Sequence, residues 1–286
     1  MMASNQDDVS VLNVDKKDSV TEKHASIAAC ELSKKLQKIM LRLKGEFMSE
    51  DGKKINYNRI KGSPLFAEYK QEAKQLQNVD LESLSELEKK VFFINTYNAL
   101  TIHGLAEQQT IPDSVLRIQQ FWKTTGYNIG GHVFTLDDIE HGILRSNRGH
   151  PASIQPQFPP KDPRLKFIVK QIDPRIHFAL VCGAKSCPAI NVYTTENIEN
   201  ALMDATKNFC KQEVSMFTET EEIWLSKLFQ WYRQDFGETD VHVVRWTIPY
   251  LEPNIQDRAE ILLMKLTTQG TVSINYNYYD WALNAS

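Results

Sequence analysis

Two thiols and an imidazole lie within eleven residues of the segment 175–190, RIHFALVCGAKSCPAI. A cysteine becomes nucleophilic when a positive charge, a helix N-terminus or turn amides stabilise its thiolate. Such a nucleophile also needs a base, and a further group that orients the base. Cys182 ends an apolar run and precedes Gly183, where a backbone can turn sharply and offer amide donors. This pattern favours thiol chemistry with Cys182 as the attacking sulfur.

The apolar run predicts a strand over 176–182, with Cys182 at its carboxyl end. Side chains alternate along a strand, so His177 and Cys182 should point to opposite faces. We therefore expect the base to come from elsewhere in the chain, with His103 and His141 as the candidates. Cys187, in the following turn, can face His177 instead.

Two other interpretations of the cysteines stay open. Buried, inert cysteines are common, and Cys182 would then be a core residue. In the second interpretation, a metal would have three ligands from the chain: His177, Cys182 and Cys187. Four residues separate the two thiols, unlike the C-x2-C spacing of most zinc knuckles, and His177 and Cys182 face opposite ways. We therefore expect neither a metal site nor a cofactor.

The longest helical pattern of the chain, from Asp80 or Ser83 to about Gln108, carries polar residues in an otherwise apolar half. Asn95 and Asn98 are three residues apart and share one face, whereas His103 lies further round the helix. A buried amide costs stability unless it is hydrogen-bonded. The two asparagines therefore either tie down a neighbouring loop or line a pocket.

A second predicted helix, 136–145, places three polar residues on one stripe. Asp137, His141 and Arg145 are spaced i, i+4 and i+8, so Asp137 can accept a hydrogen bond from the His141 ring and fix its tautomer. The alternative is a solvated charged face. The polar loop that follows, 146–163, contains five prolines and is predicted to act as a lid.

The elements that position these residues indicate an α/β or α+β fold, rich in helices around a small central sheet. An apolar stripe from Ile27 to Leu43 predicts an amphipathic N-terminal helix that packs or dimerises. Further helices are expected after the Ser63-Pro64 cap and at the Ser83 to Glu86 capping-box spacing. The predicted strands are 127–136, where Gly130-Gly131 indicates a hairpin, 167–169, 176–182, a hairpin over 214–225, and 270–276.

The composition and charge of the chain limit the classes of protein to which it can belong. The chain has 286 residues, 42% of them hydrophobic and 24% charged, with a formal net charge of -3. No basic stripe favours nucleic acid, and no apolar run is long enough for a membrane span. The polar N-terminus has no signal-peptide core and the cysteine spacings are irregular, so we expect a reducing, cytoplasmic setting.

Three parts are expected along the chain: a disordered tail over 1–20, a helical lead-in over 21–80 and a core domain over 81–286. Five blocks within that core carry a family resemblance. These are FFINTYNALTIH (92–103), TLDDIEHGILR (135–145), HFALVCGAKSCPAI followed by VYT (177–194), LSKLFQWYRQDFG (225–237) and YYDWALN (278–284). Together and in this order, they resemble the domain-of-unknown-function family 547.

The resemblance implies little chemistry, because the family has no catalytic assignment to carry over. Members occur in bacteria, plants and animals, some beside glutaredoxin-like or leucine-zipper segments. Some similar members carry serine at the position of Cys187, and the plant members tend to lack the histidine of position 177. The resemblance thus implies that Cys182 matters more than Cys187 and that a mechanism requiring His177 would not be shared by the whole family.

We expect a cysteine-dependent hydrolase or transferase that acts on an acyl or amide bond of a small-molecule or peptide substrate. The expected catalytic residues are Cys182, His103, His141, Asn98, Asn95 and His177. The expected substrate-binding residues are Arg145, Cys187, Ser186, Tyr97 and Asp235. One alternative is a non-catalytic interaction domain with a structural network of buried polar groups, which can dimerise through the N-terminal helix. The other is a metal-dependent enzyme that uses the histidines.

Overall fold

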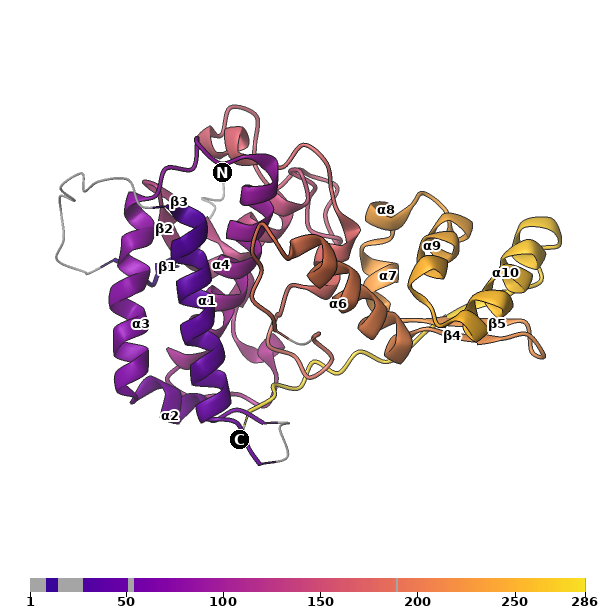
Figure 1. Cartoon of the computed structure of the whole chain (residues 1–286), viewed down its shortest axis with the longest axis horizontal. Helices are drawn as coiled ribbons and strands as arrows, with labels where there is room; N and C mark the ends of the chain where they lie inside the picture. The colour runs from indigo at the N-terminus through magenta and orange to yellow at the C-terminus, as the bar shows by residue number, and fades with distance from the viewer. Residues whose placement is uncertain (1–8, 15–27, 51–53, 189, 286) are drawn as a thin grey trace, which may run out of the picture. The chain divides into compact units, whose positions relative to one another are not determined.

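The computed structural model describes residues 9–14, 28–50, 54–188 and 190–285. By their internal contacts, the residues divide into two compact units. One comprises Met1–Ile172, Leu180–Ile198 and Trp281–Ser286, and the other comprises Asp173–Ala179 and Glu199–Asp280. Helices predominate in both, and the described strands form two three-stranded sheets (Figure 1). The helix-rich α+β fold is therefore confirmed, with two small sheets in place of one.

The first unit begins with a group of helices that bury the predicted N-terminal stripe. These are α1 (Ala29–Glu46), α2 (Tyr57–Lys61), α3 (Pro64–Lys74), η1 (Gln75–Asn78) and α4 (Glu86–Ala106). The stripe of α1, which includes Leu36, Met40 and Leu43, is buried as α1 packs on α3 and α4 (Figure 1). This apolar face is thus used inside the unit, so the described contacts do not support a homodimer through it.

Helix α4 is the centre of this unit. In its capping box the Glu88 amide donates to the Ser85 hydroxyl and the Ser85 amide donates to the Glu88 carboxylate, so the predicted start at Ser83 lies two residues early. From Val91 to Ala106 every residue is buried. Such a helix has no solvent face, so each polar side chain on it must find a partner inside the protein.

The sheet of the first unit consists of β1 (Ser10–Val11), β2 (Thr125–Ile129) and β3 (His132–Thr135). Strands β2 and β3 form the predicted hairpin, whose turn uses Gly130 and Gly131 at positive φ. Strand β1 pairs in parallel with β2, and the buried Asn13 side chain bonds both strand and helix backbone. The predicted disordered tail is therefore wrong for residues 9–14, and its remainder lies outside the described residues.

Two of the predicted strands are helical turns instead. Residues 163–167 form the 3-10 helix η4 (Pro163–Phe167), and residues 174–178 form η5 (Pro174–Phe178). Each begins at the proline of an Asp-Pro-Arg sequence, in which the aspartate caps the turn by accepting from the arginine amide. This repeated cap overrides the apolar runs that predicted strands over 167–169 and 176–182, because proline after a capping aspartate favours the first turn of a helix.

The second unit contains helices around a second sheet. They are α6 (Ile198–Glu213, whose first residue lies in the first unit), α7 (Lys227–Trp231), α8 (Arg233–Phe236), α9 (Asp240–Thr247), η6 (Ile248–Tyr250) and α10 (Pro253–Thr268). Strands β4 (Ser215–Phe217) and β5 (Glu222–Leu225) form the predicted hairpin, and β6 (Ser273–Tyr276) pairs in parallel with β5. Phe178, Phe229 and Trp246 are among the aromatic rings packed in its core.

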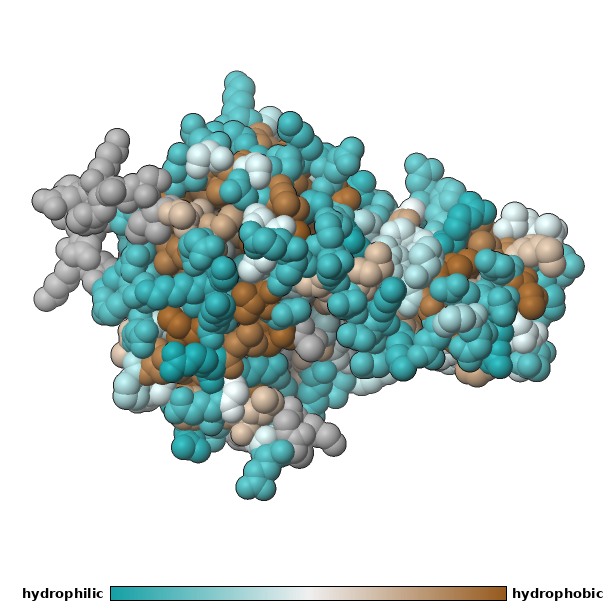
Figure 2. Space-filling view, in the orientation of Figure 1, coloured by the Kyte–Doolittle hydropathy of each residue, from teal (hydrophilic) through white to brown (hydrophobic). Residues whose placement is uncertain are grey.

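No helix in the described ranges is both long and apolar enough to cross a membrane. The face shown in Figure 2 is mainly hydrophilic, with separate hydrophobic patches.

Candidate functional site

The two cysteines of the 175–190 segment face each other. The Sγ atoms of Cys182 and Cys187 are 2.9 Å apart, and the Cys182 amide donates a hydrogen bond to Cys187 Sγ over 3.2 Å. Both cysteines are outside any disulfide, and both are half-buried. Gly183 makes the turn possible, since its φ of +93° is unfavourable for other residues and a Cβ there would lie 2.8 Å from Leu105. The turn therefore presents a pair of thiols rather than one.

Amide side chains of α4 hold this segment, because it forms no strand. Asn98 Oδ1 accepts a hydrogen bond from the amide of Val181, the residue before Cys182, over 2.8 Å. Asn95 donates to the carbonyl of Tyr193 and accepts from its amide, over 2.8 and 3.0 Å. Of the two roles that the sequence left open, both asparagines fulfil the first by tying down a loop. That loop carries the thiols.

The chain terminus holds the turn from its other side. The Lys185 amide donates to the Ala282 carbonyl, and Ala184 forms an isolated bridge with Leu283. Ser186 lies in the same turn and is half-buried. The segment is thus fixed at both ends and in the middle by neighbours distant in sequence.

A lysine of α1 lies near Cys187. Burial lowers the pKa of Lys44, and the negative charge of an ionised Cys187 offsets part of that effect. The same charge adds to burial in raising the pKa of Tyr57, whose hydroxyl donates to Asn284. Lys44 was not predicted from the sequence, where it is one of several lysines between the apolar residues of the helix.

His103 occupies an aromatic cluster in the core. Its Nδ1 lies 2.7 Å from the Tyr127 hydroxyl, which also bonds the Tyr69 hydroxyl at 2.6 Å, and its ring packs edge-on against Phe66. Burial lowers the pKa of His103 to about 3. The imidazole therefore stays neutral, and its contacts suit a structural residue better than the predicted base.

His141 lies on an unusual helix. The predicted helix 136–145 is the π-helix η3 (Asp138–Leu144), a rare conformation that often marks functional sites. Arg145 Nη1 lies 3.0 Å from His141 Nδ1. Arginine can only donate, so Nδ1 accepts and the neutral imidazole carries its proton on Nε2. Nε2 is 3.8 Å from Asp137 Oδ1, too long for the predicted hydrogen bond. Asp137, His141 and Arg145 are thus buried, and they do not form the solvated charged face that the sequence left open.

Helix α4 also contacts η3. The Tyr97 hydroxyl donates to Glu140 Oε2 over 2.9 Å, and Glu140 Oε1 lies 3.9 Å from His141 Nδ1. Tyr97 is next to Asn98 in α4, so neighbouring residues bind η3 and the thiol segment. Glu140 was not among the predicted residues, although it directly precedes His141 in the sequence.

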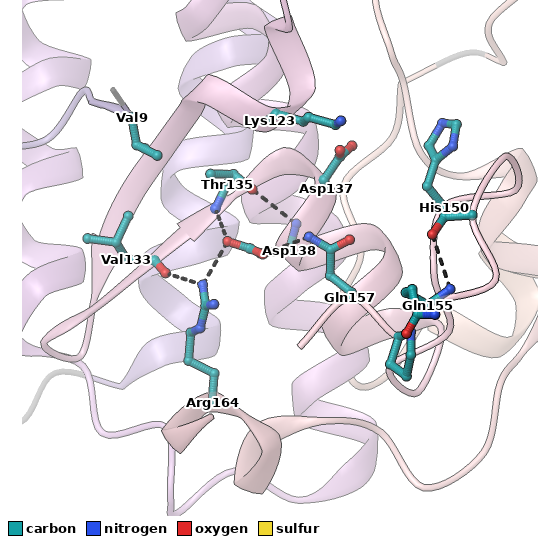
Figure 3. A pocket seen from close by; sticks show the side chains of 12 residues that line it. Val9, Lys123, Val133, Thr135, Asp137, Asp138, His150, Gln155, Gln157 and Arg164 are labelled. Atoms are coloured by element: carbon teal, nitrogen blue, oxygen red, sulfur yellow. Dashed lines mark hydrogen bonds and ion pairs between the residues drawn. The ribbon is translucent and has the colours of Figure 1, made fainter. Parts of the chain in front are cut away.

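Asp137 faces a pocket of about 510 Å3 in the first unit (Figure 3). Burial, followed by the charge of Glu140, raises the pKa of Asp137 from 3.8 to about 7. The adjacent Asp138 is instead fully engaged by the Thr135 amide, Gln157 and Arg164. Asp137 is therefore a buried carboxyl that titrates near neutral pH, as general acids and bases often do.

The predicted lid, 146–163, packs over η3. The Phe158 ring is buried where Gly142 leaves room, since a Cβ at Gly142 would lie 2.3 Å from that ring. The Asn147 side chain fixes Phe158 by bonding both its amide and its carbonyl. Gln155 and Gln157 from this loop line the pocket. The loop thus forms one wall of the pocket.

His177 and Asp235 form a pair in the second unit. His177 Nε2 lies 2.8 Å from Asp235 Oδ2, both side chains are almost fully buried, and the imidazole stacks on Tyr232 with ring centres 3.9 Å apart. Within the second unit, His177 and Asp235 thus partner each other. Among the described residues, no group of three or more His, Cys, Asp or Glu is placed to hold a metal ion.

No curated protein and no solved structure matches the chain. Residues 81–210 match the family model described as "Protein of unknown function, DUF547". The resemblance seen in the sequence is therefore confirmed. The matched range contains α4, η3 and the thiol turn, whereas the blocks 225–237 and 278–284 lie beyond it.

Replacing Asp137 with asparagine should stabilise the fold above pH 7. With a carboxyl pKa raised from 3.8 to about 7, the folded state loses stability as the pH rises between these values. Urea unfolding at pH 8 should give the variant a free energy of unfolding about 1–4 kcal/mol higher. The gap should close toward acidic pH. A matched Asp113→Asn variant, at an exposed carboxylate, should leave the free energy of unfolding almost unchanged. A D137N protein less stable than the original chain at pH 8 would contradict the raised pKa of Asp137.

Mild oxidation by hydrogen peroxide should join Cys182 to Cys187. Peroxide converts one thiol to a sulfenic acid and releases water, and the second thiol then displaces another water to give the disulfide. Peptide mass spectrometry should find this linkage within one chain, with the fully buried Cys210 still reduced. The Cys187→Ser variant should form no disulfide. If both cysteines stay reduced under conditions that oxidise a model dithiol, the close approach of the Cys182 and Cys187 sulfurs would be refuted.

Proposed function

We propose that the chain is a thiol-dependent hydrolase or transferase with the Cys182–Cys187 pair as its reactive centre. The observation that carries this proposal is the 2.9 Å separation of two half-buried thiols. Sulfurs this close can share a proton, so that one thiolate is held by the other thiol. An inert core cysteine would have no need of such a partner.

Cys187 is the sulfur better suited to carry the charge. It accepts the Cys182 amide, and Lys44 lies near it. Hydrogen-bond donors and positive charge both favour a thiolate. The Cys182 thiol can then pass its proton to Cys187 as it attacks. Cys187 thereby takes the part of the base that the sequence had assigned to His103 or His141.

The reaction follows from this arrangement. Cys182 Sγ attacks an acyl carbon, a C–S bond forms, and the bond to the leaving group breaks. The leaving group departs with the proton held by Cys187. Water or an acceptor amine or alcohol then displaces the acyl group and returns a proton to the pair, which gives hydrolysis or transfer. The amides of Gly183 and Ala184, which donate to no backbone acceptor among the described residues, are assigned to the oxyanion.

The substrate class remains the one expected from the sequence, an acyl or amide bond in a small or peptide-like molecule. The mechanism needs both thiols reduced, which suits a cytoplasmic enzyme. Arg145, Tyr97 and Ser186 keep their proposed substrate-binding role. Asp235 is bonded to His177 and is not needed by this mechanism.

A non-catalytic interaction domain is the second candidate. The observation in its favour is that the buried polar groups named as site residues have structural partners. Asn95 bonds Tyr193, His103 bonds Tyr127, and His177 bonds Asp235. In that case the thiol pair would be unreactive in the folded protein.

Iodoacetamide distinguishes the two candidates. In the folded chain, Cys182 should be alkylated near neutral pH faster than Cys30 or Cys210, because burial raises the pKa of these two thiols to about 11 and about 12. In a Cys187→Ser variant, alkylation of Cys182 should slow at least about tenfold at pH 7, since its proton acceptor is lost. A Cys30→Ser variant serves as the control and should label Cys182 at the original rate. Thiols inert until unfolding would favour the interaction domain.

A further inference from the structure

The pocket beside Asp137 is separate from the proposed thiol mechanism. It lies between the β2–β3 hairpin, η3 and the loop 146–163, and its volume of about 510 Å3 suits a small metabolite (Figure 3). None of the steps assigned to Cys182 and Cys187 uses a residue of this pocket. Its function therefore needs its own explanation.

Two opposite charges in the pocket have no hydrogen-bonded partner among the described residues, and the nearby His141 Nε2 is 3.8 Å from Asp137 Oδ1. Asp137 is only 7% exposed and accepts no hydrogen bond from the described residues. Lys123 lies beside Asp137, where its charge lowers the pKa of that carboxyl, but it forms no ion pair within the described ranges (Figure 3). By contrast, Arg164 is bonded to both Asp138 and Asp162. A buried carboxylate without a donor is costly, so it needs a cationic or N–H ligand.

The titratable groups around Asp137 determine whether this site favours a cationic or an anionic ligand. They are Glu140, Asp138 and His141 of its own helix, Lys123 of α5 (Phe121–Thr124), and His150 of the loop. Burial is the largest cause of the raised pKa of Asp137, and among the charges Glu140 raises this pKa more than Lys123 lowers it, with Asp138 raising it further. The field at its carboxylate is thus net negative and attracts a cation.

A donor and an apolar rim complete the pocket. His150 Nδ1 accepts the Ala152 amide, and burial lowers the pKa of His150, so the neutral ring carries its proton on Nε2 as a donor. Val9 and Val133 are exposed apolar side chains that line the pocket. The pocket therefore offers an anionic group, a cationic group, a neutral donor and an aliphatic surface.

We propose that this pocket binds a small zwitterion of the α-amino acid class with an aliphatic side chain. The ligand ammonium pairs with Asp137, its carboxylate with Lys123 and His150, and its side chain contacts Val9 and Val133. A monovalent amine or carboxylate would satisfy only one of the two charges. The pocket thus recognises the two charges together.

Calorimetric titration of the full chain with L-leucine tests the proposal, using two analogues that each lack one charge. At pH 8, leucine should bind more tightly than 3-methylbutylamine and 4-methylpentanoate. Its affinity should fall about tenfold from pH 8 to pH 6, as a carboxyl with a pKa of about 7 becomes protonated. Circular dichroism confirms folding of each variant.

Two variants assign the contacts. Asp137→Asn should lose leucine binding, and Lys123→Gln should bind leucine no better than the amine. Asp113→Asn, at an exposed ion pair remote in sequence, should bind leucine like the original chain. Absence of leucine binding at pH 8, equal binding by the D137N protein, or tighter binding at pH 6 would each overturn the proposal.

Discussion

The hydrogen bond from the Val181 amide to Asn98 is the constraint on which the rest of the proposed site depends. The thiol segment forms no strand, so no ladder of backbone bonds fixes Cys182. Amide side chains of α4 take the place of a neighbouring strand, with Asn95 repeating the arrangement at Tyr193. Removing one such partner leaves a backbone group unsatisfied, at a cost of about 1–3 kcal/mol. The position of the thiols is therefore set by a buried helix.

The same helix joins the two chemically distinct regions. Asn98 binds the thiol segment, and its neighbour Tyr97 binds Glu140 on η3. The π-helix in turn places Asp137 at the pocket, where its charged form destabilises the fold. Residues that cost stability commonly persist for function, which is a reason to assign a ligand to Asp137.

Local patterns in the sequence predicted most of α4, the N-terminal helix and both hairpins, because period and turn chemistry fix these elements. They failed at 176–182, where the cap formed by Asp173 and Pro174 prevails over an apolar run. Site residues were harder to predict. The roles of Asn95 and Asn98 required knowledge of which loop passes α4, and Lys44 approaches Cys187 only through tertiary packing. The role of Cys187 as a partner of Cys182 likewise depends on the turn between them, which no spacing rule defines.

Trapping an acyl-enzyme tests the central claim most directly. The folded chain would be incubated with a small acetyl thioester, quenched in acid and mapped by peptide mass spectrometry. The account predicts an acetyl group on Cys182 that disappears in Cys182→Ala and accumulates more slowly in Cys187→Ser, with Cys30→Ser unchanged. Acetylation confined to surface lysines, or equal among all four cysteines, would contradict a reactive centre at Cys182 and Cys187.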